Sequence, residues 1–248
     1  MVDVELARFI ANDYRGLPDA PAFELACGAV PVLVSAPHAV THERDGKVKP
    51  SDDYTGSLAL LVAKLARCHS IVACRYSATD PNWDPLERCA YKQAAVAHVR
   101  EHGIKALVDI HGMVSASPAL AALGTADGET VAARPQLRDQ ALKLLQSRLG
   151  PSVEQYGKPV VVDGRYAARG ANTVASTVAR ECGIPCLQIE LATALRVPSR
   201  RGSHPVEGDQ PFLPGQRSAE LSARRNPNPQ AVVDTIGALV ELVELLAH

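Results

Sequence analysis

The chain has 248 residues, of which 46% are hydrophobic and 21% charged, and its formal net charge is −1. These values are ordinary for a soluble globular protein that buries a proper core. They exclude a strongly basic nucleic-acid-binding or membrane-surface protein. The sequence has no run of 18 apolar residues, so no membrane span is predicted. The acidic, amphipathic start does not resemble a signal peptide. We therefore expect a cytoplasmic protein.

Predicted strands and helices alternate along the chain, with apolar stripes marking the helices and short apolar runs between Gly or Pro marking the strands. In chain order they are a helix over 3–12, a strand over 30–36, a helix over 53–68, a strand over 70–76, a helix from Pro85 to His102, strands over 105–110 and 119–123, a helix over 135–149, a strand over 159–162, a helix capped by Asn172 and running to Cys182, a strand over 186–192 and a helix over 229–247. Such alternation predicts a mostly parallel sheet that helices cover on both faces.

The domain organisation is expected to be simple. The chain shows no internal repeat, no low-complexity tract and no domain boundary. We therefore predict one α/β domain over 1–248. Within it, residues 198–229 are rich in Pro, Gly and Arg and predict a long loop or lid.

Ionisable side chains stand in or directly after three of the predicted strands. His111 ends the strand in V-D-I-H-G-M-V, His38 follows the strand over 30–36, and Glu190 lies inside C-L-Q-I-E-L-A. Core strands rarely carry such groups without a partner. The carboxyl ends of parallel strands meet at one edge of a sheet. Two imidazoles and a carboxylate gathered there predict a hydrolytic zinc site.

A catalytic zinc needs a third protein ligand and leaves a further position for water. A loop running from His38 to the helix over 53–68 could fold back and present a carboxylate, which favours Asp52, then Asp53. Glu43 ranks third because T-H-E-R-D-G is typical of an exposed turn. For the same reason we expect His42 to face solvent and to be a weak ligand candidate.

Two further acids have predicted roles beside the metal. Asp109 lies two residues before His111, on the same face of the strand, and would orient that imidazole or the bound water; alternatively, it bonds to a helix N-terminus. Glu190 has Ile189 and Leu191 as neighbours, and burial should raise its pKa. That suits a general base; the alternative is a buried ion pair with Arg196.

Other polar residues are harder to assign from the sequence. A guanidinium binds a carboxylate in bidentate fashion, so Arg165, Arg169 and Arg196 are the best candidates to hold an acidic substrate. The six cysteines form no C-x-x-C and are expected to be reduced, buried hydrophobes rather than metal ligands. His69, His98 and His102 are expected to be solvated at helix ends or on helix surfaces.

Four motifs in order resemble a known family. P-H-A-V, S-D-D-Y-T-G, D-I-H-G and L-Q-I-E-L-A are similar to the motifs of the N-formylglutamate amidohydrolase family, distant relatives of zinc carboxypeptidases. The resemblance covers about residues 30–196. It implies a three-layer α/β/α sandwich of the phosphorylase/hydrolase-like kind. It also implies that one zinc is held by His38, the Asp52/Asp53 pair and His111, with Glu190 as the catalytic carboxylate.

The chain also departs from the family pattern. Val40 replaces the glycine of P-H-x-G, and T-D-P-N-W-D-P over residues 79–85 replaces the family's D-x-N-R segment. We expect substrate discrimination in this segment, with Asn82 and Arg88 as candidate substrate contacts.

The predicted function is a zinc-dependent amidohydrolase. Its substrate would be a small N-acylated amino acid, N-formylated ones included, or a related carboxylate, and no nucleic acid or membrane partner is expected. One alternative is a zinc exopeptidase acting on short or cell-wall-derived peptides. The other is a non-catalytic small-molecule binding protein with the same fold. The oligomeric state stays open.

Overall fold

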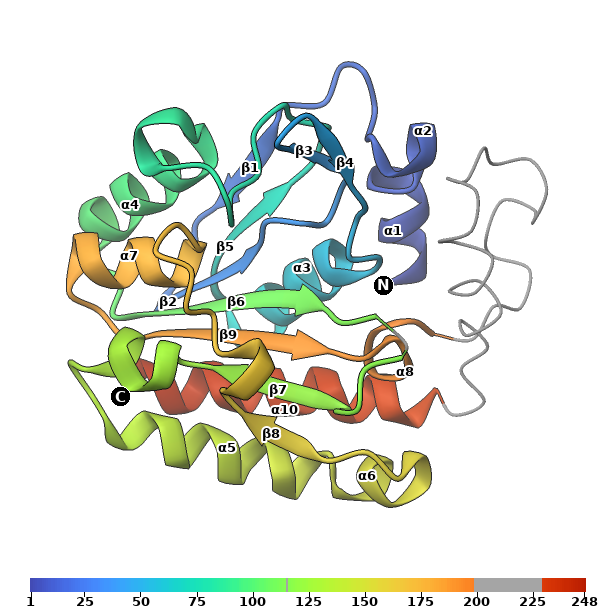
Figure 1. The fold of residues 1–248 in the computed structure, drawn as a ribbon, viewed down its shortest axis with the longest axis vertical. Coiled ribbons are helices and arrows are strands. Elements are labelled where there is room, and N and C mark those ends of the chain that lie inside the picture. Colours follow the sequence, from blue (N-terminus) through green and yellow to red (C-terminus); the bar gives the residue numbers. More distant parts are fainter. Residues whose placement is uncertain (115, 199–228) are drawn as a thin grey trace.

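Seven strands form a single sheet in the order β1-β5-β2-β6-β9-β7-β8 (Figure 1). The computed structural model describes residues 1–114, 116–198 and 229–248. The strands are β1 (Phe23–Ala26), β2 (Val30–Ala36), β5 (Cys68–Ala73), β6 (Ala106–Gly112), β7 (Ala121–Gly124), β8 (Val160–Val162) and β9 (Cys186–Leu191), and a separate hairpin joins β3 (His42–Arg44) to β4 (Lys47–Lys49). The four strands β5, β2, β6 and β9 run parallel to one another.

Helices cover both faces of the sheet. One group contains α3 (Thr55–Ala66), α5 (Gln136–Arg148) and α10 (Gln230–Ala247), which pack side by side, and the other contains α4 (Ala90–His102) and α7 (Val174–Cys182) (Figure 1). Shorter helices are α1 (Val2–Arg8), α2 (Ala11–Tyr14), α6 (Gly150–Tyr156) and α8 (Thr193–Arg196), with 3₁₀ turns at Leu86–Arg88, Ala126–Val131 and Gly164–Tyr166. The predicted α/β/α sandwich with a mostly parallel sheet is confirmed.

The centre of the sheet is apolar on both faces because helices cover it on both sides. All six residues of β5 are buried, and so are the last five of β2 and the first six of β6. Burying such β-branched and aliphatic side chains stabilises the fold by about 1.5–3 kcal/mol for each large one. Asp109 and His111, on β6, are thus buried ionisable residues within a largely apolar layer.

Three strands run against the central four. β1 is antiparallel to β5, and β7 is antiparallel to β9 and parallel to β8. The sequence pattern did not predict β1 or the β3–β4 hairpin. The three-residue strands β3 and β4 are too short to show a period. The hairpin turns at Asp45 and Gly46, both with positive φ, as a tight hairpin turn requires.

The lid prediction over 198–229 lies almost wholly outside the described residues. The prediction of one domain over 1–248 stays a prediction. Within the described ranges, no helix is both long and apolar enough to cross a membrane.

The N-terminal cap of α7 differs from the predicted one. Thr173, not Asn172, is the cap, and its hydroxyl accepts a hydrogen bond from the Ser176 N–H at 3.0 Å. The Asn172 amide instead donates to the Trp83 carbonyl at 3.0 Å. Both are good capping residues, so composition alone could not separate these neighbours.

We expect Thr173→Ala to lower the free energy of unfolding by about 1 kcal/mol, because it leaves a helix N–H without its acceptor. Asn172→Ala is the matched control and should cost less. Urea denaturation followed by circular dichroism measures both. A larger loss for Asn172→Ala would contradict the assignment of the cap.

Candidate metal centre

Three predicted ligands meet at the carboxyl edge of β2 and β6. His111 is the penultimate residue of β6, and His38 follows two residues after β2 ends. Asp52 reaches them because its N–H donates to the His38 carbonyl at 2.8 Å. The loop after His38 thus folds back, as expected. The β3–β4 hairpin forms the part of the chain between His38 and Asp52.

The ligand atoms have the spacing of a metal site. Asp52 Oδ2 lies 3.4 Å from His38 Nδ1 and 3.3 Å from His111 Nδ1, and all three side chains are buried. Atoms on one tetrahedral zinc stand about 3.3–3.5 Å apart, given bond lengths of about 2.0–2.2 Å. His38 Nδ1 is buried and has no hydrogen-bond partner among the described residues. The donor set therefore fits a zinc ion.

A buried carboxylate fixes the far nitrogen of each imidazole. His38 Nε2 lies 2.8 Å from Asp80 Oδ1, and His111 Nε2 lies 3.0 Å from Asp109 Oδ2. Both aspartates are fully buried. A carboxylate there favours a proton on Nε2 and leaves the Nδ1 lone pair for a metal. This geometry agrees with the predicted orienting role of Asp109.

Sequence reasoning missed Asp80. It lies in the segment over 79–85 where we expected substrate contacts, and a polar loop gives no signal of side-chain direction. Arg44 Nε donates to its other oxygen at 2.8 Å. Burial alone would raise the pKa of Asp80, but His38 and Arg44 outweigh it and hold that pKa well below its usual range.

The three candidate ligands and their neighbours place opposite charges in contact. Burial would raise the pKa of Asp52, but Lys49 at 3.1 Å, together with His111 and His38, holds it well below its usual value. Burial would lower the pKa of His111, but Asp109, Asp52 and Glu190 raise it well above 6.5. Asp52 is therefore ionised, and a metal bound here would have to displace a proton from His111.

Glu190 stands beside His111 on the next strand. The two residues are register partners in the β6–β9 pairing. Burial raises the pKa of Glu190, and the charge of Asp52 adds to this, while His111 and Lys49 oppose it. Its carboxylate accepts a hydrogen bond from Gln188 Nε2 at 3.0 Å. A partly buried carboxylate with a raised pKa next to a candidate metal site has the properties of a general base.

Arg196 lies buried beneath the site. Its guanidinium donates to the main-chain carbonyls of Asp53, Leu191 and Met113. These contacts do not pair it with Glu190, the alternative considered for that acid. They hold the turn that carries the acidic pair and favour a structural role, so its predicted substrate contact stays untested. A Cβ at Gly112 would come 2.7 Å from the guanidinium carbon, so a larger residue there would require the Arg196 side chain to shift.

The other ligand candidates bond elsewhere. Asp53 Oδ1 accepts from the Ser51 hydroxyl at 2.8 Å, and Glu43 Oε2 accepts from the Tyr76 hydroxyl at 2.9 Å. The geometry therefore favours Asp52.

The expectation that His42 faces solvent is wrong. The hairpin folds over the end of β2 and buries His42, and its Nε2 bonds to the Pro37 carbonyl at 2.5 Å. Burial and the nearby His38 lower its pKa to about 4. His42 is thus a neutral residue packed beside the ligand group.

Of the predicted substrate residues, the structure places Asn82 at the site. Its Nδ2 lies 3.1 Å from His111 Nε2, and its Oδ1 accepts from the Val174 N–H at 2.9 Å. Arg88 and Arg165 are exposed, and their substrate roles stay predictions.

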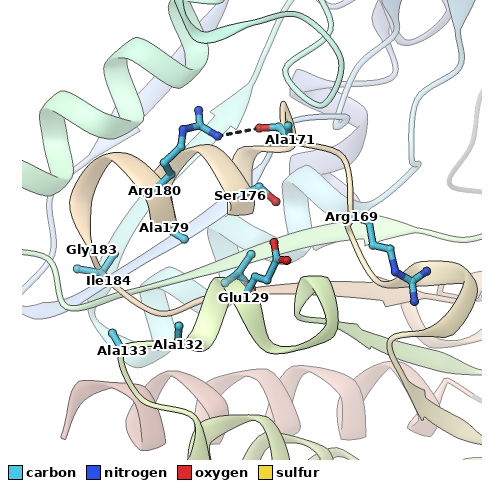
Figure 2. Close-up of a pocket in the computed structure, with 11 residues that line it drawn as sticks. Glu129, Ala132, Ala133, Arg169, Ala171, Ser176, Ala179, Arg180, Gly183 and Ile184 are labelled. Carbon is cyan, nitrogen blue, oxygen red and sulfur yellow. Dashed lines mark hydrogen bonds between the residues drawn. The ribbon is translucent and has the colours of Figure 1, made fainter.

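Arg169 lines a different pocket, of about 410 Å³, between α7 and the residues around Glu129 (Figure 2). Its guanidinium is paired with Asp127. The lining of this pocket includes none of the metal-site residues. The structure therefore does not bring Arg169 together with His38, Asp52 and His111.

We expect Asp80→Asn to weaken zinc binding by about 10–100-fold, because an amide no longer fixes the His38 imidazole as a carboxylate does. Glu43→Gln is the matched control, because it makes the same kind of change at a carboxylate that bonds to Tyr76 and not to a ligand. It should leave the zinc affinity unchanged. Calorimetric titration of zinc into chelator-treated protein measures both. Equal affinities of Asp80→Asn and the unmodified protein would show that Asp80 does not position a ligand.

Known proteins resemble this chain in structure but not in sequence. No protein-family model and no curated protein matches it. N-formylglutamate amidohydrolase from Ralstonia eutropha JMP134 shares its fold, with a TM-score of 0.54 and 16% identity over 92% of this chain and 98% of that one. A bacteriophage poly-gamma-glutamate hydrolase has a TM-score of 0.52 and 15% identity, over 91% of this chain and 90% of that one. A gene product of Agrobacterium tumefaciens has a TM-score of 0.51 and 13% identity, over 92% of this chain and 95% of that one. The predicted resemblance is confirmed at the level of the fold.

Proposed function

We propose that this chain is a zinc-dependent amidohydrolase that cleaves the amide bond of a small N-acylated amino acid or a related carboxylate. The observation that carries the proposal is the convergence of His38 Nδ1, Asp52 Oδ2 and His111 Nδ1 beside Glu190. Two proteins that share the fold are named as hydrolases of N-formylglutamate and poly-gamma-glutamate. Both substrate names describe acidic compounds with an amide bond.

His38, Asp52 and His111 would hold one zinc ion, which supplies Lewis-acid chemistry when bound by polarising the amide carbonyl and making water more acidic. Glu190 then takes the proton of the attacking water and passes it to the leaving amine. Its raised pKa suits this exchange, since the carboxylate must be protonated between the two steps.

Arg44 is our candidate for the group that receives the substrate carboxylate. It contacts Asp80, which bonds His38, and its guanidinium lies 5.3 Å from the centre of the Trp83 ring. The side chain of Arg44 is 34% exposed, so part of its guanidinium remains accessible to a substrate. A bidentate guanidinium is well matched to a carboxylate. Among the described residues, Arg44 is therefore better placed than Arg169 for this role.

The direct test is hydrolysis by the zinc-loaded protein. Chromatography of reactions with N-formyl and N-acetyl derivatives of acidic and neutral amino acids should show release of the free amino acid. Glu190→Gln should keep its zinc and lose about 10²–10⁴-fold in turnover. Glu43→Gln, which changes a partly exposed carboxylate outside the ligand group, is the control and should retain turnover.

The alternatives give different results in the same assay. Cleavage of dipeptides without cleavage of N-acyl amino acids would replace the proposal with an exopeptidase. Zinc binding with no cleavage of either class would leave a binding protein. Near-normal turnover by Glu190→Gln would contradict the general-base role.

We expect the acid limb of the pH–rate profile to depend on Lys49. Glu190 must be ionised to accept a proton, so turnover rises with pH through its pKa. The Lys49 charge lowers that pKa; removing it in Lys49→Met should therefore move the acid limb to higher pH. Lys47→Met removes an exposed charge from the same short strand and is the matched control. An unmoved limb in Lys49→Met would argue against Glu190 as the titrating base.

A further inference from the structure

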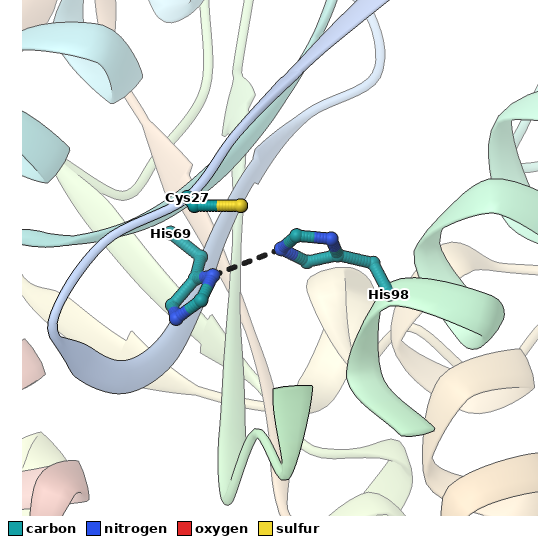
Figure 3. A group of neighbouring side chains, drawn as sticks. All are labelled: Cys27, His69 and His98. Atoms are coloured by element: carbon teal, nitrogen blue, oxygen red, sulfur yellow. Dashed lines mark hydrogen bonds between the residues drawn. The ribbon is translucent and has the colours of Figure 1, made fainter. Parts of the chain in front are cut away.

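A second group of metal-binding side chains lies at the opposite edge of the sheet. Cys27 directly follows β1, His69 is the second residue of β5, and His98 lies on α4 (Figure 3). β1 is antiparallel to β5 and Ala26 pairs with Ser70, which brings Cys27 next to His69. His69 stands at the amino end of β5, whereas His111 and Glu190 stand at carboxyl ends. The two groups are therefore separate.

The ligand atoms of this group converge. One nitrogen or sulfur from each of Cys27, His69 and His98 lies within 4.8 Å of the others. His69 Nδ1 and His98 Nε2 are 2.9 Å apart and share one hydrogen bond. Two nitrogens on one zinc stand about 3.4 Å apart, so the pair must open by about half an ångström. Rotation of the two rings supplies a movement of that size.

A third imidazole stands at the rim of the group. His102 Nε2 lies 3.9 Å from the Cys27 sulfur, and its ring centroid is 4.2 Å from that of His98. Four nitrogen or sulfur donors thus occupy one corner of the molecule. Cys27 is exposed, so an ion can reach its sulfur from solvent.

The chemistry of the group suits a soft or borderline ion. Burial and the neighbouring His102 lower the pKa of both His69 and His98, which keeps the imidazoles neutral and their lone pairs available at pH 7. Thiolate and imidazole ligands select zinc and similar transition ions over magnesium or calcium.

Two expectations from the sequence are corrected here. His69 and His98 are buried rather than solvated, because β5 begins at Cys68 and places His69 inside the strand. Cys27 is exposed rather than a buried hydrophobe. The scattered spacing of these residues gave no sign that they meet.

We propose that Cys27, His69 and His98 form a second site, which binds a zinc-class divalent ion and ties the end of edge strand β1 to helix α4. The site contains a thiol, whereas the ligand group of His38, Asp52 and His111 contains none. This difference gives each site its own spectroscopic signature, and the second site does not depend on the proposed function.

The test is a titration of cobalt(II) into chelator-treated full-length protein. We expect a near-ultraviolet thiolate-to-cobalt charge-transfer band that saturates with one ion. Cys27→Ser and His98→Ala should abolish the band. Cys182→Ser, which removes a thiol outside the group, should keep it. His111→Ala should also keep it while losing the ion at the first site, so failure of either site is seen separately.

Three results would overturn the proposal. The first is no charge-transfer band in the unmodified protein. The second is a band that survives in Cys27→Ser, since another thiol would then be the ligand. The third is a band that survives in His98→Ala with native circular dichroism, since His98 would then not be a ligand.

Discussion

The cost of burying ionisable groups shapes the carboxyl edge of this sheet. His38, Asp52, His111 and Asp109 are all buried there, and isolated charges in such a place would cost many kcal/mol. The protein offsets that cost by pairing each imidazole with carboxylates at 2.8–3.4 Å. Such an arrangement favours a cation at its centre, because a cation satisfies the carboxylate and both lone pairs together. The apolar core thus supports a polar site only where its groups satisfy one another.

The scaffold holds this arrangement from outside. Asp80 fixes His38 and is itself held by Arg44. Arg196 holds the main chain at Asp53, and the lack of a side chain at Gly112 gives it room. These supporting contacts come from the hairpin, the loop after β5 and the chain beyond β9. Preorganisation of this kind fixes ligand geometry better than loops alone can.

The parts predicted from the sequence are those with local signals. The strands bearing His111 and Glu190 were predicted because polar residues interrupted apolar runs, and Asp52 followed from the need for a third ligand. Asp80 and the Cys27 group could not be predicted in this way. Their roles depend on which loops and strands meet in three dimensions. The spacing of residues along the chain does not predict those contacts. His42 was misjudged because the three-residue strands of its hairpin are too short to show a periodicity.

The central claim is that His38, Asp52 and His111 bind one metal ion through Nδ1, Oδ2 and Nδ1. Anomalous diffraction at the zinc absorption edge, from crystals of the zinc-loaded protein, tests it most directly. The account predicts a peak between these three atoms, at coordination distance from each. Zinc-loaded crystals with no peak there, or with a peak that excludes His38 or His111 from coordination, would contradict it.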